Sequence, residues 1–204
     1  AGVLRAVRDG LDREGLSILT WSAAATRLRR RLAFLHAVIG APWPDVSDEA
    51  LLTHLDTWLG PDLDGVHRRP DGGGLARIDV LRALRRLLPW PDAARLDVLA
   101  PERLAVPSGS QVAIDYDDPG QPVLPVRVQE AFGWHATPRL ADGRVPVLLH
   151  LLSPGGRPAA VTADLESFWR TGYPQVRAEL RGRYPKHAWP EDPLTAAPTR
   201  GVRR

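Results

Sequence analysis

Apolar residues recur every three or four positions along three segments of the first half of the chain, 22–39, 47–58 and 75–88. This spacing places them on one face of a helix. Ser22 and Ser47 stand at the starts of the first two segments, where a hydroxyl can accept a hydrogen bond from a free backbone N–H. The pattern therefore predicts three amphipathic helices, two of them with capping residues.

Glycine and proline mark the boundaries of these helices. Gly40 follows the first helix and Gly60-Pro61 is expected to stop the second, because these residue types end helices. We expect a Gly-rich loop over 61–75 and a further short helix near 92–99. Short helices joined by short loops are typical of a helical bundle, which we predict for residues 1–100.

After Pro101 the apolar positions alternate with polar ones, which indicates strands. Val112, Ile114 and Tyr116 lie on one face of such a strand, and that face is expected to be buried. Ser108-Gly109 is a two-residue hairpin signal. Strands are predicted over 103–107, 111–116, 123–128, 144–152 and 159–161, with a short helical piece near 129–132.

Five strands with a helix between the third and the fourth follow the order of an OB-fold, a barrel that commonly binds nucleic acid. We therefore predict an OB-like five-stranded β-barrel over residues 101–162. An ordinary layered arrangement of helices and sheet is the alternative that the same pattern allows. In both cases the fold class is α+β.

Residues 163–204 are predicted to form a helical, basic and Pro-rich C-terminal extension. Thr162 is the expected cap of its first helix, with Leu165, Phe168 and Trp169 facing inward. Pro174 suits the first position of a second helix, which is expected to end around residue 182. An extended, irregular tail should follow, because prolines recur at Pro185, Pro190, Pro193 and Pro198.

Composition limits the kinds of protein that this chain can be. Its 204 residues are 44% hydrophobic, which is ample for a buried core. Cysteine is absent, which excludes disulfides and is compatible with a reducing cytoplasm. The longest apolar run, 147–152, is far too short to span a bilayer, so we expect a cytoplasmic protein without membrane contact. The chain begins at Ala1 and has no methionine, so we expect a fragment or a processed form.

Positive charge is concentrated near the end of the chain. Residues 168–187 carry five cations against Glu179 alone, and all but one of the cations are arginines, whose planar fork suits phosphates. Aromatic residues stand among them, and cations with aromatics allow phosphate contact together with base stacking. The predicted RNA-binding residues are Arg170, Arg177, Arg181, Arg183, Tyr184, Lys186 and Trp189.

A structural interpretation of the same residues stays open. The aromatic side chains can anchor the Pro-rich tail to the domain, while the arginines pair with Glu179, Glu191 and Asp192. Two further groups of arginines, at 27–31 and 82–86, are interpreted as solvated helix faces, with nucleic-acid contact as the alternative.

Motifs for catalysis are absent from the sequence. The Gly-rich run at 72–74 has no lysine or hydroxyl after it, so it is not a phosphate-binding Walker A loop. The six histidines include no pair four residues apart, so no metal site is expected. We predict no catalytic residue, no metal and no cofactor in this chain, and no hydrolysis of ATP by the chain alone.

Several longer stretches of sequence resemble one family. They are 106–110 (Val-Pro-Ser-Gly-Ser), 126–130 (Val-Arg-Val-Gln-Glu), 143–154, the Ser-Phe-Trp-Arg run at 167–170, and 181–193. In these stretches, and more loosely over 20–99, the chain is similar to the C-terminal region of the bacterial DEAH-type ATP-dependent helicase family HrpB.

The resemblance implies an accessory helicase region that binds single-stranded RNA, or another nucleic acid, and regulates the motor. In that family two RecA-like motor domains lie upstream in the same polypeptide, and ATP and Mg²⁺ would be held there. A different hypothesis is a protein-docking module, whose basic tail and tryptophans bind a partner or the motor domains without contacting RNA.

Overall fold

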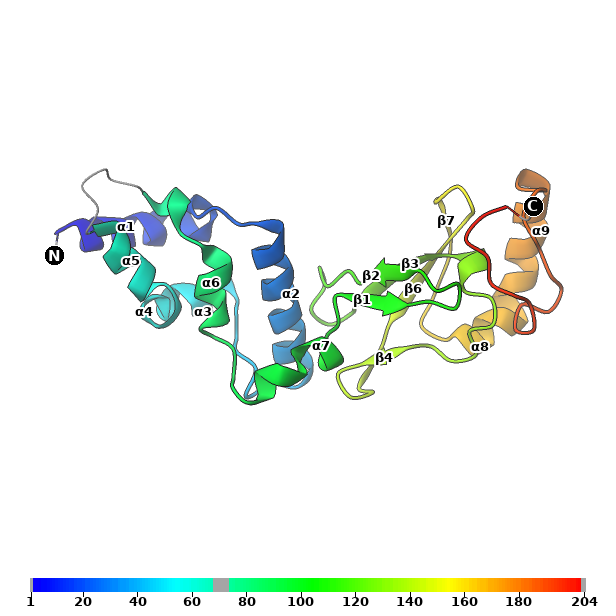
Figure 1. Cartoon of the computed structure of the whole chain (residues 1–204), viewed down its shortest axis with the longest axis horizontal. Coiled ribbons are helices and arrows are strands. Elements are labelled where there is room, and N and C mark those ends of the chain that lie inside the picture. Colours follow the sequence, from blue (N-terminus) through cyan, green and yellow to red (C-terminus); the bar gives the residue numbers. More distant parts are fainter. Residues whose placement is uncertain (1, 68–73, 203–204) are drawn as a thin grey trace. The chain divides into compact units, whose positions relative to one another are not determined.

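The computed structural model describes residues 2–67 and 74–202 (Figure 1). The chain divides into two compact units, residues 1–96 and 97–204. The first unit is helical. Its elements are α1 (Gly2–Glu14), the 3₁₀ turn η1 (Gly15–Ile18), α2 (Ala23–Val38), α3 (Asp48–Thr53), α4 (Leu55–Trp58), α5 (Gly60–His67), the 3₁₀ turn η2 (Leu75–Arg77), α6 (Val80–Arg85) and the 3₁₀ turn η3 (Asp92–Arg95).

Both predicted caps of the first unit are confirmed. The backbone N–H of Ala25 donates to Ser22 Oγ at 3.1 Å, and that of Ala50 donates to Ser47 Oγ at 3.2 Å. Each bond satisfies one of the donors that a helix leaves free in its first turn. The apolar stripe of α2 is also buried as predicted, at Leu28, Leu32 and Leu35.

Two boundaries in the first unit differ from the predictions. Pro61 does not stop a helix but lies in the first turn of α5, where the N–H that proline lacks has no helical partner in any case. The helix expected over 75–88 begins only at Val80, because Asp79 caps it through the N–H of Arg82 at 3.0 Å. Helix α1 was not predicted. The central part of the Gly-rich loop, 68–73, lies outside the described residues.

The second unit combines short strands with helices. Helix α7 (Leu96–Leu99) leads into it. Its strands are β1 (Arg103–Ala105), β2 (Gln111–Ala113), β3 (Val123–Arg127), β4 (Arg139–Leu140), β5 (Val145–Pro146), β6 (Leu148–Leu152) and β7 (Pro158–Thr162), with the 3₁₀ turn η4 (Val128–Glu130) after β3. The hairpin of β1 and β2 around Ser108-Gly109 is confirmed.

The predicted five-stranded OB-like barrel is wrong. Within the described residues the strands form three short sheets, ordered β1-β2, β3-β6-β7 and β4-β5, and none is closed. The cause lies in the strand expected over 144–152, which changes partner at Val147. Before that residue β5 pairs antiparallel with β4, and after it β6 runs parallel to β3. Pro146 has no N–H with which to continue one ladder. A mixed fold of helices and small sheets remains.

The C-terminal helices follow the prediction except at their cap. They are α8 (Leu165–Ser167), a π-helical turn η5 (Phe168–Gly172) and α9 (Tyr173–Arg183), with Pro174 in the first turn of α9. Asp164, and not Thr162, caps the first of them, since Asp164 Oδ1 accepts from the N–H of Ser167 at 3.0 Å. The hydroxyl of Thr162 instead accepts from the N–H of Asp164.

An aromatic cluster forms much of the core beneath these helices. Phe132 is fully buried, and the centroid of its ring lies 6.2 Å from that of Trp169 and 5.9 Å from that of Tyr173. The tilted and edge-on geometries are those that aromatic quadrupoles favour. Trp169 also donates its Nε1–H to the carbonyl of Trp134 at 2.9 Å. The cluster fixes the helices of residues 165–183 onto the segment after β3.

Candidate nucleic-acid interface

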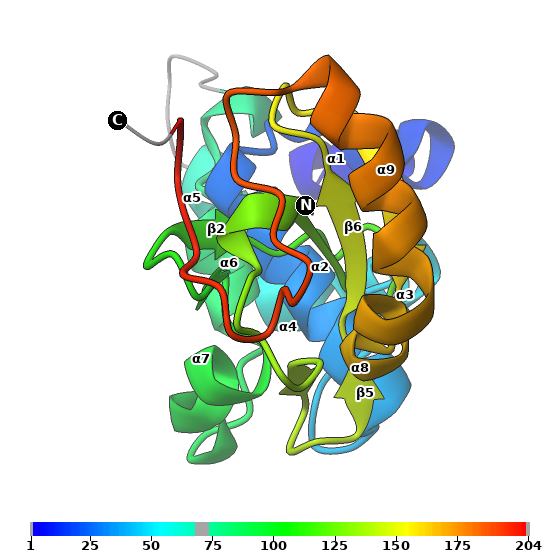
Figure 2. The same ribbon diagram turned by 90° about the vertical axis from the view of Figure 1, so that its right-hand side faces the viewer.

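The tail, residues 184–202, returns along the second unit in an irregular path, as its prolines predict (Figure 2). Backbone hydrogen bonds hold it at two places: Gly133 N–H donates to the carbonyl of Pro193 at 2.9 Å, and Thr199 N–H donates to that of Gln129 at 3.0 Å. Near its end, Arg200 Nε donates to the carbonyl of Ser108 at 3.0 Å. The tail is therefore an integral part of this unit.

Tyr184 and Trp189, two of the predicted RNA-binding residues, make hydrogen bonds within the chain. Trp189 donates its Nε1–H to the carbonyl of Tyr184 at 2.9 Å, and the Tyr184 hydroxyl lies 3.3 Å from Ser153 Oγ. Both side chains are half-buried. These contacts favour the anchoring interpretation for the two aromatics, while their stacking on bases stays a prediction.

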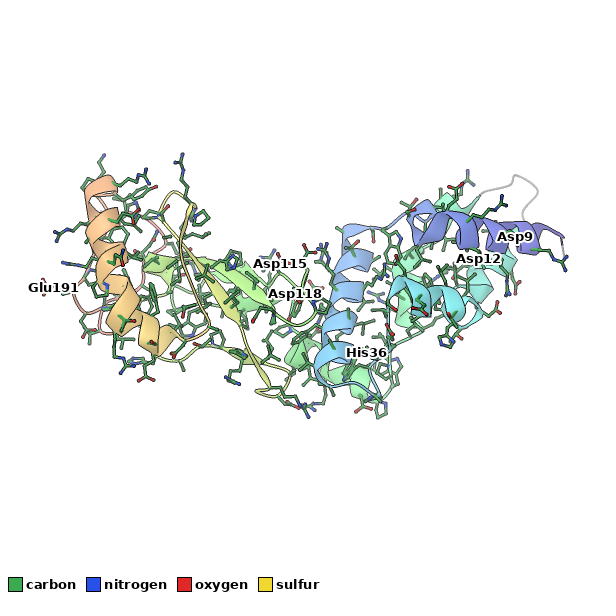
Figure 3. All side chains as sticks on the ribbon, turned by 180° about the vertical axis from the view of Figure 1, so that it is seen from behind. Asp9, Asp12, His36, Asp115, Asp118 and Glu191 are labelled. Atoms are coloured by element: carbon green, nitrogen blue, oxygen red, sulfur yellow. The ribbon has the colours of Figure 1, made fainter. Side chains whose placement is uncertain are left out.

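Arg177 is also engaged with the tail. Its Nε donates to the carbonyl of Trp189 at 2.8 Å, and its Nη2 lies 3.8 Å from the carboxylate of Glu191, which Figure 3 labels beside α9. Four residues earlier, Tyr173 donates its hydroxyl to the carbonyl of Pro190 at 2.7 Å. Burial raises the pKa of Tyr173 to about 12, although the charge of Arg177 acts in the opposite direction. The tail is thus pinned to α9 by two side chains of that helix.

Arg177→Ala is expected to loosen the tail without unfolding the unit. The substitution removes a hydrogen bond from a charged donor, a contact that contributes about 1.5–3 kcal/mol. Amide hydrogen exchange of residues 187–196 should speed up, while that of β6 should stay unchanged. Arg170→Ala, which removes the same charge from an exposed position, is the matched control. Equal exchange in the two variants would contradict the pinning role.

The remaining predicted cations point to solvent. Arg170, Arg181, Arg183 and Lys186 are all exposed. Within the described ranges 2–67 and 74–202, no ion pair holds any of these four. Three of them, Arg181, Arg183 and Lys186, follow one another at the end of α9 and the start of the tail. This end of α9 is an exposed basic surface of the kind that attracts phosphate.

The other two groups of arginines include side chains that are paired within the first unit. Arg29 donates to Asp48 at 2.6 Å and its guanidinium lies 5.0 Å above the ring of Trp21. Arg82 and Arg86 both bind the buried carboxylate of Asp62. Burial alone would raise the pKa of Asp62, but hydrogen bonds from the two arginines hold it below its usual value. Pairing within the unit therefore applies to Arg29, Arg82 and Arg86, while Arg27 and Arg85 are exposed, as the solvated-face interpretation predicts.

Sequence reasoning missed a buried carboxylate that joins two of the distinctive stretches. Glu130 is buried and accepts hydrogen bonds from the hydroxyls of Ser108 at 2.9 Å and Ser110 at 2.6 Å. Its own carbonyl accepts from the N–H of Ser108 at 3.2 Å. Both stretches, 106–110 and 126–130, carry the family resemblance, but no spacing in the sequence indicates that they meet. The contact fixes the β1–β2 turn to η4.

The described residues hold no group of three or more His, Asp or Glu side chains placed to bind a metal ion. In the part of the chain that the structure describes, no helix is long and apolar enough to cross a membrane. The second unit presents an exposed basic surface at the end of α9, next to a buried aromatic cluster.

Comparison with known proteins agrees with this description. The family described as ATP-dependent helicase C-terminal, HrpB_C, matches residues 58–193. The ATP-dependent RNA helicase HrpB of Escherichia coli (strain K12) is 46% identical in an alignment of 203 residues that covers 98% of this chain and 24% of that protein. The chain therefore spans about a quarter of the length of this relative.

Two solved structures have the same fold. The crystal structure of the E. coli DExH-box NTPase HrpB matches 95% of this chain and 24% of that one, with a TM-score of 0.82 and 46% identity. That of the E. coli DEAH/RHA helicase HrpB matches 91% of this chain and 23% of that one, with a TM-score of 0.71 and 44% identity.

These matches define the class as the C-terminal region of ATP-dependent helicases. Within that class, the chain belongs to the HrpB C-terminal family. The resemblance read from the sequence is confirmed.

Proposed function

We propose that this chain is the accessory C-terminal region of an HrpB-like ATP-dependent RNA helicase of the cytoplasm. It binds single-stranded RNA and regulates the RecA-like motor domains of the same polypeptide. ATP and Mg²⁺ belong to those motor domains, and the chain contributes no catalytic residue of its own. The name of the E. coli relative supports RNA as the nucleic acid.

One observation carries the proposal: the basic residues at the end of α9 are exposed, while their neighbours are held. Arg177 binds the carbonyl of Trp189 in the tail, and Trp189 itself donates to Tyr184 within the tail. Arg181, Arg183 and Lys186, in contrast, face solvent. Exposed cations on a fixed backbone are suited to binding phosphate, because the backbone is already ordered and binding costs less conformational entropy. The structural and the RNA-binding interpretations thus apply to different residues of one surface.

The salt dependence of RNA affinity tests this function. Cations that neutralise phosphates release counterions, so the logarithm of the association constant should fall linearly with the logarithm of salt concentration. Three to four contacts predict a slope of about −2 to −3 for single strands, at about 0.7 per phosphate. Fluorescence anisotropy of a labelled oligouridylate measures it. Affinity that does not change with salt would contradict the proposal.

A docking role remains a second candidate because Trp90 is 71% exposed. The other six tryptophans are buried or half-buried. Exposed tryptophans are enriched among the residues that dominate protein interfaces. Backbone bonds from Trp90 N–H to Leu88 and from Ala93 N–H to Pro89 hold the turn that presents the ring.

Trp90→Ala is expected to leave RNA affinity unchanged and to weaken binding to separately produced motor domains by about thirtyfold or more. A loss of at least 2 kcal/mol is typical of a dominant interface residue. Calorimetry without RNA measures it. Val98→Ala is the control, since Val98 is 70% exposed as well. If both variants bind the motor domains as the parent chain does, Trp90 is not a docking residue.

A further inference from the structure

The turn between β6 and β7 lies against the end of α9. This turn, Ser153–Arg157, is closed by its own hydrogen bonds: Ser153 N–H donates to the carbonyl of Arg157 and Gly156 N–H to that of Ser153, both at 2.8 Å. The Ser153 hydroxyl accepts from the N–H of Arg157 at 3.2 Å. Gly156 has a φ of +82°, which favours glycine. The turn is therefore a fixed support for the exposed side chain of Arg157.

Tyr184 joins this turn to α9. Its hydroxyl lies 3.3 Å from the Oγ of Ser153, a residue only 2% exposed. A Cβ atom added to Gly155 would lie 2.7 Å from the same hydroxyl, so the close approach requires glycine at that position. The ring of His187 meets the Tyr184 ring edge-on, with centroids 6.2 Å apart. Tyr184 is thus enclosed by the turn and by the first residues of the tail.

The cations nearest to Tyr184 in the sequence are Arg183, just before it, and Lys186, two positions after it. Both are exposed. Since Tyr184 touches Ser153 and Gly155, the exposed cation of the turn, Arg157, belongs to the same end of the unit. No ion pair within the described residues holds any of these three cations. Sequence patterns did not include Arg157, because 26 residues separate it from Arg183.

We propose that Arg157, Arg183 and Lys186 form one phosphate-binding site for the backbone of single-stranded RNA, built from two elements. Tyr184 is its positioning residue: it holds the β6–β7 turn beside the end of α9 and keeps the cations in register. This proposal rests on the proposed RNA-binding function and adds the β6–β7 turn to the RNA-binding surface. Arginine at the turn supplies a planar fork for phosphate oxygens, and lysine a mobile point charge.

Two substitutions distinguish the charge of Arg157 from the positioning role of Tyr184. Arg157→Ala should flatten the salt slope of oligouridylate binding by about 0.7. Arg144→Ala is the matched control, since Arg144 is also an exposed arginine in a turn of the same unit, and it should leave the slope unchanged. Gly155→Ala removes no charge but displaces Tyr184, and it should weaken RNA binding at low salt.

A double-mutant cycle then tests the coupling. The effect of Arg157→Ala should shrink when Gly155→Ala is already present, because neighbouring residues that act together are not additive. Thermal unfolding of each variant shows that the unit still folds. If Arg157→Ala matches Arg144→Ala while Arg183→Ala with Lys186→Ala weakens binding, the two-element site is wrong and the proposed function stands. If the parent chain shows no salt-dependent RNA binding, both are wrong.

Discussion

Replacing Phe132 with alanine is expected to lower the free energy of unfolding of the second unit by about 3–5 kcal/mol, the range for truncating a fully buried aromatic residue. Phe132 is 0% exposed and its ring contacts those of Trp169 and Tyr173. The substitution removes buried area and leaves a cavity between the helices of residues 165–183 and the segment after β3. The lost burial and the cavity both lower the free energy of unfolding, which is small for a domain of this size.

Urea unfolding followed by hydrogen exchange of β6 measures this loss. Val161→Ala is the control, since Val161 is 58% exposed on β7 and surface substitutions usually change stability by less than about 0.5 kcal/mol. A Phe132→Ala chain as stable as the Val161→Ala chain would show that the aromatic cluster is not the core of this unit.

Changing Arg181, Arg183 and Lys186 together to alanine is expected to have the largest effect on RNA binding. Each phosphate contact contributes about 0.7 to the salt slope for single strands, so the slope should flatten by up to about two. Affinity should fall steeply at low salt and little at high salt, where counterions already screen the phosphates. Anisotropy titrations at four or more salt concentrations measure both changes.

The control for this triple variant removes the same charge elsewhere on the unit. Arg103, Arg139 and Arg144 are exposed arginines on β1, on β4 and in the turn between β4 and β5, whereas the end of α9 lies against the β6–β7 turn. Their joint replacement by alanine should flatten the slope far less. If the two triple variants lose affinity equally, net charge rather than a defined surface governs binding. If the α9 variant instead keeps its affinity and melts much earlier, the anchoring interpretation applies to these residues too.

Local signals in the sequence predicted local structure well. A serine before an apolar stripe predicts a capped helix because the cap bond joins residues three apart, as Ser22 and Ser47 show. The alternation at Val112, Ile114 and Tyr116 predicted which side chains face inward, since the two faces of an extended chain depend only on residue parity. Ile114 and Tyr116 are buried and Val112 is half-buried, although β2 itself ends at Ala113. Pro174 in the first turn of α9 is a prediction of the same kind.

Pairing between distant segments could not be predicted in this way. The apolar run over 144–152 is compatible with one long strand, and nothing in it shows that the hydrogen-bonding partner changes at Val147. The OB-like barrel failed for that reason. Helix ends set by competing caps were also missed, such as the start of α6 at Val80, because Asp79 lies inside an otherwise regular apolar pattern.

At the candidate site, too, local features could be predicted from the sequence and contacts between distant segments could not. Charge density identified the end of α9, because cations clustered in sequence stay clustered on one helix end. The sequence could not separate Arg177, which binds the tail, from Arg181, which is exposed, since both lie on α9 four residues apart. Nor could it bring Arg157 to Tyr184, a juxtaposition made only by the fold.

The most direct test of the central claim is to map where RNA touches the chain. Single-stranded RNA carrying 4-thiouridine, photocrosslinked to the whole chain and analysed by mass spectrometry, reports the contacted peptides. We predict crosslinks in peptides that cover residues 151–160 and 178–189, and these crosslinks should diminish as salt is raised. Crosslinks confined to the first unit, or none above those of a scrambled-charge control protein, would contradict it.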